Sequence, residues 1–167
     1  MYTYTIMQLK TFFTLLLVTV LYGCATSPEF NTEQVDTTLT PQSVIADADN
    51  SLGKIALWGG TILDTRNLEK NTQIEVLAYP LDSYQRPLQS KKPLGRFIII
   101  HAGYLEPETF APGQLLTVLG GVSKSQSGKI GESNYTYPVV TANQLHLWSL
   151  DGTRSKTSFH FGIGIRL

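Results

Sequence analysis

The ionisable residues of this 167-residue chain do not form a recognised metal-binding pattern. Its three histidines, His101, His146 and His160, lack the H-x-x-x-H or H-E-x-x-H spacing that sets two ligands on one metal ion. His146 and His160 alternate with apolar neighbours, which predicts that both face solvent. One cysteine in the whole chain excludes a four-thiolate zinc site and an intrachain disulfide. We therefore predict no metal site and no cofactor.

Catalytic motifs are likewise incomplete. The stretch GVSKSQSGKI (121–130) carries glycines and a lysine, but Ile130 stands where a phosphate-binding loop needs Ser or Thr, so we expect a hairpin loop. The SLGK stretch (51–54) fits S-x-x-K without its companion S-D-N and K-T-G motifs. Glu106 and Glu108 are interpreted as solvated surface carboxylates. The sequence predicts that this protein is not an enzyme.

The only cysteine, Cys24, follows an apolar stretch and precedes a polar one. Residues 11–22 would span about 18 Å as a helix, against about 30 Å of hydrocarbon, which suits a signal peptide better than a membrane span. The residues Leu-Tyr-Gly-Cys (21–24) resemble a bacterial lipobox, although Tyr22 departs from its usual small or β-branched residue. The alternative is a buried core cysteine.

The lipobox resemblance implies cleavage between Gly23 and Cys24 and acylation of Cys24, and two or more acyl chains would anchor a protein firmly. It divides the chain into a signal peptide (1–23), a lipidated cysteine with a flexible tether (24–42), and one domain (43–167). Thr40 and Pro41 have the types expected at the start of a short helix.

Strand-like stretches fill the predicted domain, with turn formers between them and little helix. We expect an all-β fold, a small closed OB-like barrel of about six to seven strands with at most one or two short helices. The glycine pairs 59–60 and 120–121 suit bulges or sharp bends of such a barrel. The predicted strands are 54–63, 72–81, 95–103, 114–122, 135–140, 143–149 and 159–167.

Charge excludes one class of partner. The formal net charge is zero, and charged residues make up only 16% of the chain. Without a basic run, the chain has no electrostatic footprint for nucleic acid and no polybasic patch for an anionic membrane surface. We expect no nucleic-acid partner.

Aromatic residues offer one candidate binding face, because OB-type barrels bind ligands by stacking on aromatic rings. The simpler interpretation assigns the same rings to the barrel core and its rim. Four polar residues, Asn67, Asp82, Arg86 and Arg96, are interpreted as turn-fixing residues or members of an ion pair. The candidate ligand-facing residues are Trp58, Tyr79, Tyr104, Tyr135, Tyr137 and Trp148.

Several motifs in a fixed order resemble the Slp family of outer-membrane lipoproteins, which are inducible by starvation or stationary phase in Gram-negative bacteria. They are WGGTI, IEVLAYPLDSYQRP, GRFIIIHAGYLEPETFAPGQLLTVLGGV, GKIGESNYTYPVV and LHLW. The resemblance implies a palmitate-type lipid anchor, a place on the periplasmic face of the outer membrane and a role in envelope stress response. It implies no reaction and no ligand.

Together these observations predict a lipid-anchored envelope protein with a structural or interaction role. Its partners would be the membrane, through the N-terminal lipid, and an envelope protein or cell-wall component. The alternative is a periplasmic module that binds a sugar, peptide or cell-wall fragment on an aromatic-lined face.

Overall fold

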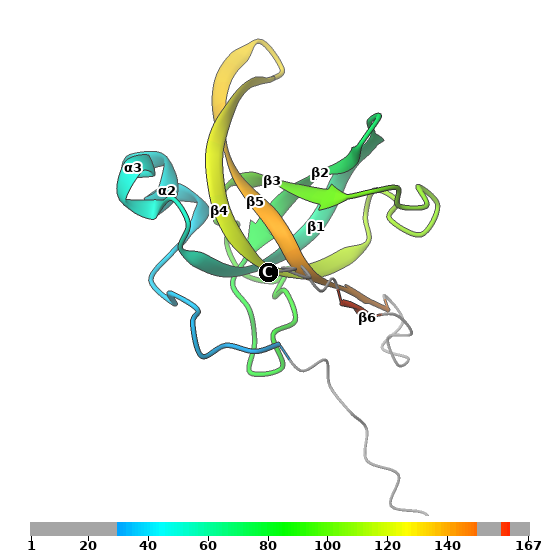
Figure 1. Ribbon diagram of the computed structural model, residues 1–167, viewed down its shortest axis with the longest axis horizontal. Coiled ribbons are helices and arrows are strands. Elements are labelled where there is room, and N and C mark those ends of the chain that lie inside the picture. Colours follow the sequence, from blue (N-terminus) through cyan, green and yellow to red (C-terminus); the bar gives the residue numbers. More distant parts are fainter. Residues whose placement is uncertain (1–29, 150–157, 161–167) are drawn as a thin grey trace, which may run out of the picture.

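A computed structural model describes residues 30–149 and 158–160 of the chain (Figure 1). No helix within these residues is long and apolar enough to cross a membrane. Two short helices precede the sheet, and their bounds, with those of the strands, are α2 (Pro41–Ala46), α3 (Ala48–Ser51), β1 (Ile55–Asn67), β2 (Asn71–Tyr79), β3 (Arg96–Ala102), β4 (Leu115–Ile130), β5 (Ser133–Trp148) and β6 (Ser158–His160).

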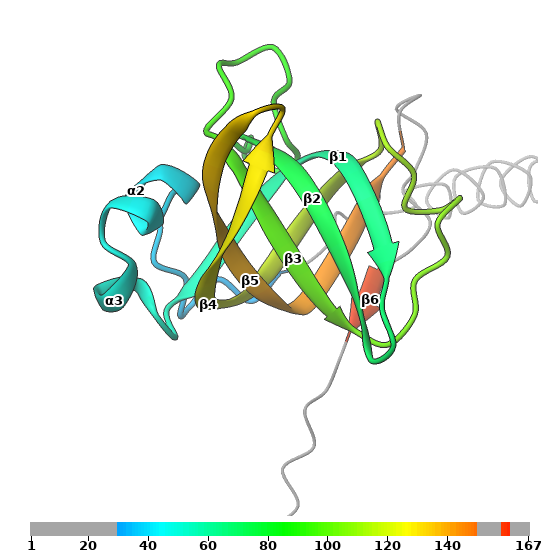
Figure 2. The same cartoon turned by 90° about the horizontal axis from the view of Figure 1, so that it is seen from above.

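The strands close into a barrel in the order β3-β2-β1-β4-β5, because β5 returns to pair with β3. Neighbours are antiparallel except at this closure, where residues 98–100 of β3 run parallel to residues 139–141 of β5. β6 pairs with residues 144–146 of β5, beyond the β3 contact. Figure 2 shows the strands wrapping around one interior. The predicted all-β closed barrel with few short helices is confirmed.

The predicted number of strands was wrong, since five strands close the barrel instead of six or seven. The stretches 135–140 and 143–149 merge into β5, and residues 121–130, expected to form a hairpin loop, extend β4; each strand is 16 residues long. Of the predicted last strand, residues 159 and 160 lie in β6, and residues 161–167 are outside the described residues.

Alternation of side chains builds the core as the sequence pattern predicts. In β2 every second residue is buried, with Ile74, Val76 and Ala78 facing the interior. The interior is also filled from β3 by Phe97 and Ile99, both fully buried. Burial of these side chains is the main stabilising contribution to the barrel.

Two glycines let neighbouring strands approach closely. A Cβ on Gly60 would lie 2.0 Å from the Leu77 carbonyl oxygen, and one on Gly120 would lie 2.1 Å from the Thr141 carbonyl oxygen. Gly120 also sits at a register shift in β4, as its sequence predicts, whereas the shift in β1 falls at 62–64, beyond the 59–60 pair. Any side chain at these two positions would force the strands apart.

The outer halves of β4 and β5 form a long hairpin that extends from the barrel at the top of Figure 1. A register shift between Ser123 and Gln126 interrupts the ladder at its base. Tyr137 packs over Gly128, and with Ile98 and Val139 it forms a small second core outside the barrel. This second core explains why a polar stretch that resembles a loop is held as strand.

Candidate functional site

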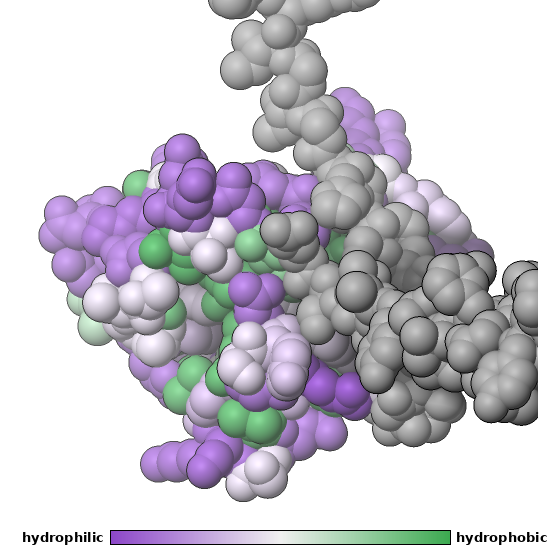
Figure 3. All heavy atoms as spheres, turned by 90° about the horizontal axis from the view of Figure 1, so that it is seen from below, coloured by the Kyte–Doolittle hydropathy of each residue, from purple (hydrophilic) through white to green (hydrophobic). Residues whose placement is uncertain are grey.

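The candidate site is a cavity of about 380 Å³ where the chain enters the barrel. Three parts of the chain line it: the N-terminal segment (residues 30–40), the first half of β1, and the end of β2 with the 80–94 loop. The segment and the loop both lie at the bottom of Figure 1. The view from below shows hydrophobic surface in a depression bordered by hydrophilic residues (Figure 3). This size is typical of a small-molecule site.

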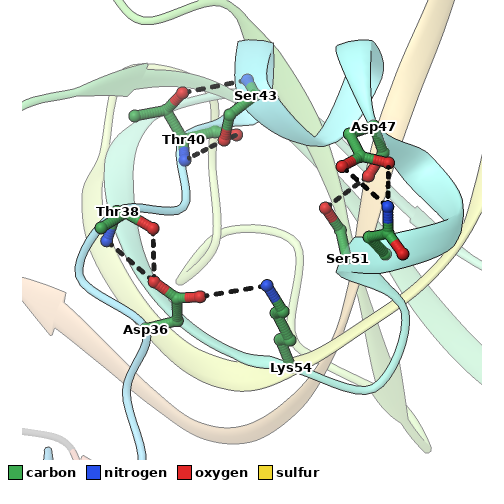
Figure 4. Close-up of polar contacts among 8 residues, drawn as sticks. Asp36, Thr38, Thr40, Ser43, Asp47, Ser51 and Lys54 are labelled. Atoms are coloured by element: carbon green, nitrogen blue, oxygen red, sulfur yellow. Dashed lines mark hydrogen bonds and ion pairs between the residues drawn. The ribbon is translucent and has the colours of Figure 1, made fainter.

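The N-terminal segment is tied to the first strand at one backbone contact. Val35 forms an isolated parallel bridge with Ile55, and the Asp36 amide donates to the Ile55 carbonyl at 3.0 Å. The Asp36 carboxylate also lies 3.4 Å from the Lys54 ammonium (Figure 4). Hydrogen bonds from the Thr38 side chain and backbone are the main reason that the pKa of Asp36 is lowered. Asp36 therefore remains an anion at neutral pH.

Helix α2 fixes the other end of the segment. The Ser43 amide donates to Thr40 Oγ1 at 3.1 Å, and the Thr40 amide donates to Ser43 Oγ at 2.8 Å (Figure 4). This capping box, followed by Pro41 at the first helical position, confirms the predicted helix start. Residues 30–42 of the predicted tether are thus seen packed on the barrel, while the domain boundaries themselves stay a prediction.

Trp58 connects the cavity to the barrel core. Its indole Nε1 donates to the Leu39 carbonyl at 2.9 Å, and its ring meets Phe97 edge to face at 5.2 Å. The indole is 5% exposed, so it lines the cavity as a fixed wall. Tyr79, at the end of β2, lines the same cavity.

The 80–94 loop contributes an unusual side chain. Asp82 Oδ1 accepts hydrogen bonds from the backbone amides of Tyr84 at 2.8 Å and Arg86 at 2.9 Å, which shapes a tight turn. Inside the turn, Gln85 has a φ of 66°, and its carbonyl accepts from Thr117 Oγ1 at 2.7 Å. The Gln85 side-chain Oε1 is buried at the cavity without a hydrogen-bond partner among the described residues.

A buried acceptor without a donor is costly, and a non-glycine residue in the left-handed region is uncommon. Both features occur in Gln85, and both are typical of residues that a binding site holds in place. No local sequence signal singles out Gln85, although its neighbours Asp82 and Arg86 are both predicted to be turn-fixing residues or members of an ion pair.

The remaining candidate aromatics lie elsewhere. Trp148 belongs to a cluster beside the loop, where its Nε1 donates to Thr117 Oγ1 at 2.9 Å and the Arg86 guanidinium lies 5.7 Å from its ring centroid. His146 meets Trp148 at 4.5 Å and Phe30 at 6.4 Å. The prediction that His146 faces solvent was wrong: it is buried, and burial lowers its pKa to about 4.

Tyr135 and Tyr137 belong to the β5 strand of the β4–β5 hairpin, and their ring centroids are 4.7 Å apart. Tyr137 OH donates to Glu75 Oε1 at 3.2 Å, and Arg96 Nη1 donates to the same oxygen at 2.8 Å. Tyr104 is 66% exposed on another loop. The six candidates therefore occupy several regions, and only Trp58 and Tyr79 meet in the cavity.

Three of the four polar residues, Asn67, Asp82 and Arg96, fit one of their two interpretations, whereas the Arg86 side chain binds a distant carbonyl. Asn67 and Asp82 fix turns, since Asn67 Nδ2 donates to the Leu105 carbonyl at 2.9 Å. Arg96 forms an ion pair with Glu75, and Arg86 donates to the Ser149 carbonyl at 2.9 Å.

Groups of three or more His, Cys, Asp or Glu side chains that could hold a metal are absent from residues 30–149 and 158–160. The predicted cleavage and lipidation residues, Gly23 and Cys24, lie outside the described residues.

Comparison with known proteins identifies the family. The model of the outer membrane lipoprotein Slp family matches residues 21–162, which is most of the chain. The chain belongs to the outer membrane lipoprotein Slp family. Membership confirms the family resemblance and assigns the protein to the outer-membrane lipoproteins. The match begins at Leu21 and so includes the predicted lipobox.

Three relatives show how far the family likeness extends. An uncharacterized protein of Haemophilus influenzae is 38% identical over 60% of this chain and 55% of its own length. The uncharacterized lipoprotein YeaY of Escherichia coli is 31% identical over 78% of this chain and 68% of its own length. The outer membrane protein Slp of the same organism is 28% identical over 59% of this chain and 52% of its own length. The match thus spans about half the length of the Haemophilus influenzae protein and of the outer membrane protein Slp.

A solved structure, Schizosaccharomyces pombe Pot1pC bound to ssDNA, is 10% identical, with a TM-score of 0.33 over 76% of this chain and 91% of that chain. A score this low carries no argument about the ligand of the Slp-family barrel.

Proposed function

We propose that this Slp-family protein is anchored through lipid on Cys24 at the periplasmic face of the outer membrane. There it serves the envelope by binding and assembly instead of catalysis, in starvation or stress adaptation. The observation that carries this proposal is the family match, which runs from the lipobox through the barrel. An envelope protein or cell-wall component would be its partner.

The length of chain between lipid and barrel supports a role close to the membrane. Phe30 is buried against the barrel, and only residues 25–29 separate it from Cys24. At about 3.5 Å per residue, six steps reach at most about 20 Å. A lipid on Cys24 would hold the barrel next to the bilayer, where it would meet membrane-bound partners.

The test is metabolic labelling with a radioactive or clickable palmitate in cells that produce the full chain. Wild type should incorporate label and fractionate with outer membranes, and Cys24→Ala should do neither. Ser27→Ala, three residues away, is the matched control and should behave like wild type. Equal labelling of wild type and Cys24→Ala would end the lipid-anchor proposal.

A second candidate is a periplasmic ligand-binding module, favoured by the cavity that holds Trp58 and Tyr79. The strand order β1-β2-β3-β5-β4 supports assignment to the OB-like barrels, a class that binds oligomeric ligands on its surface. Thermal-shift screening of the full-length lipoprotein in detergent against sugars, peptides and cell-wall fragments separates this candidate from a purely structural role. A ligand that raises the midpoint supports it, and no shift with any of them counts against it.

A further inference from the structure

We propose that the cavity between the N-terminal segment and the 80–94 loop binds a short extended peptide carrying a cationic side chain, by strand pairing with the backbone of Leu57. This inference rests on the second candidate function and names the ligand class for it. It is carried by a strand edge, an apolar lining and a set of acceptors that occur together in one cavity.

The first element is an open stretch on the edge of β1. Strand β2 ends at Tyr79, which pairs with Gly59, and the N-terminal segment contacts β1 at Ile55. The Ile55 carbonyl points toward the segment, so alternation along the strand turns the backbone N–H and C=O of Leu57 to the same side. Leu57 lies between these two contacts and lines the cavity.

On this side of β1, Leu57 has no backbone partner among the described residues. A free donor and acceptor spaced as in a strand are what an extended peptide pairs with when it adds to a sheet edge. With Ile55 and Gly59 occupied on either side, one ligand residue can form the two hydrogen bonds. This limits the ligand to a short peptide or a peptide end.

The second element is the lining. Leu39, Trp58 and Leu94 provide apolar walls from three separate parts of the chain. Trp58 is held by its hydrogen bond to the Leu39 carbonyl, so this wall is in place before a ligand arrives. A rigid apolar wall lowers the entropy lost on binding and favours a ligand with aliphatic side chains.

The third element is charge. Asp36 and Asp82 are both among the residues that line the cavity, and no Lys or Arg is. Lys54 offsets part of the Asp36 charge from outside the lining. Gln85 Oε1 adds a buried acceptor that lacks a donor. Because the cavity lining contains hydrogen-bond acceptors and acidic residues but no cationic residue, it should favour a ligand with an ammonium or guanidinium group and disfavour an anion.

The experiment uses the full-length lipoprotein in detergent and isothermal titration calorimetry. The probe is acetyl-Leu-Lys-Leu-amide, and its matched controls are acetyl-Leu-Glu-Leu-amide, a backbone N-methylated form of the lysine peptide, and chitotriose as a neutral sugar. We expect the lysine peptide to bind at least tenfold more tightly than each control. In ¹⁵N spectra the Leu57 amide should shift on binding.

Variants locate the site. Thr37→Trp places a bulky side chain on an exposed residue that lines the cavity and should abolish binding; Thr32→Trp, exposed on the same segment outside the lining, should bind like wild type. The double variant Asp36→Asn with Asp82→Asn removes both charges while the amide oxygens can still accept the turn hydrogen bonds. It should reduce the preference for lysine over glutamate at least tenfold.

Several results would overturn the inference. Equal affinity for the lysine and glutamate peptides, undiminished binding by the N-methylated form, or unchanged binding by Thr37→Trp would each do so. Binding of chitotriose in place of the peptide would overturn the peptide assignment and leave the ligand-binding function standing. The lipid anchor is tested separately by labelling at Cys24, so its failure is distinguishable from the failure of this site.

Discussion

The two ends of β1 are closed in different ways. At the Asn67 end, the 103–114 loop inserts the buried side chains of Leu105 and Phe110. Asn67 Nδ2 donates to the Leu105 carbonyl, Thr65 Oγ1 donates to the Phe110 carbonyl, and Thr72 Oγ1 accepts from the Leu105 amide. At the Ile55 end, the N-terminal segment crosses the barrel with one bridge, one indole hydrogen bond and an exposed ion pair, and it leaves a cavity.

This difference predicts that the two ends of the barrel differ in their resistance to opening, and the proposed binding cavity lies at the less densely packed end. At the Asn67 end, the buried apolar side chains and the hydrogen bonds to the loop backbone make opening costly. The Ile55 end encloses a cavity, so the N-terminal segment there should open at a lower free energy. Variants in the strands that join the two ends, and in each end separately, test this contrast.

Gly120→Ala should have the largest effect, because its Cβ would lie 2.1 Å from the Thr141 carbonyl oxygen in the barrel wall. We expect the free energy of unfolding to fall by about 4 kcal/mol, or the protein not to fold. Gly121→Ala is the matched control, since its Cβ would meet nothing within 4 Å, and its cost should stay below about 1 kcal/mol. Urea unfolding measures both, and similar values would contradict the close-approach argument.

Phe110→Ala should cost more than Leu39→Ala. Phe110 is 1% exposed in the closed end, and its truncation should cost about 3–4 kcal/mol by leaving an enclosed void. Leu39 is 9% exposed beside an existing cavity, so its truncation enlarges an open space and should cost about 2 kcal/mol. Denaturant unfolding of the two variants measures both losses of stability. A larger loss for Leu39→Ala than for Phe110→Ala would contradict the proposed difference between the two ends.

Acid should weaken the Ile55 end through His146, which contacts Phe30 at the start of the N-terminal segment. Burial lowers the folded-state pKa from 6.5 to about 4, so the unfolded chain binds a proton first as pH falls. The contribution of neutral, buried His146 to the free energy of unfolding is complete above pH 6.5. About 2–3 kcal/mol of it is lost as the pH falls from 6.5 to 4.

The measurement is the free energy of unfolding at pH 7 and pH 4 for wild type and His146→Leu. Wild type should lose more stability than the variant over this interval. An identical pH dependence would show that other groups cause the acid sensitivity.

Trp58→Phe should have the smallest global effect of the four and a local signature. It removes the Nε1 donor to the Leu39 carbonyl and should cost about 1 kcal/mol. Hydrogen exchange should accelerate at the amides of Val35, Asp36 and Leu39, all of which are hydrogen bonded. Thr65→Val, which removes a hydroxyl donor to the Phe110 carbonyl, is the control at the other end and should leave these amides unchanged.

Much of the fold follows from local patterns. Alternation in β2 predicts its buried face, and Thr40 with Pro41 predicts the start of α2, because both signals depend on neighbouring residues alone. The predicted number of strands was wrong because the local pattern of one segment is typical of a loop. The 121–130 stretch is polar and glycine-containing like a loop, yet Tyr137 on the partner strand packs over Gly128 and holds it extended.

The site was harder to predict, because its parts come from separate stretches of chain. Trp58 and Tyr79 were selected as aromatics, but the same rule selected Tyr137 and Trp148, which belong to other clusters. His146 was placed in solvent because its strand alternates, whereas Phe30, far away in the sequence, covers it.

By itself, the sequence determined the class of this protein, because the predicted lipobox, the motif order of the Slp family and the β pattern are all local patterns. Only the tertiary structure decided that β3 and β5 pair to close five strands, that residues 30–40 pack on the barrel, and that Leu57 and Gln85 face one cavity. The physical reason is that closure and cavities depend on contacts between residues distant in sequence, for which spacing along the chain carries no signal.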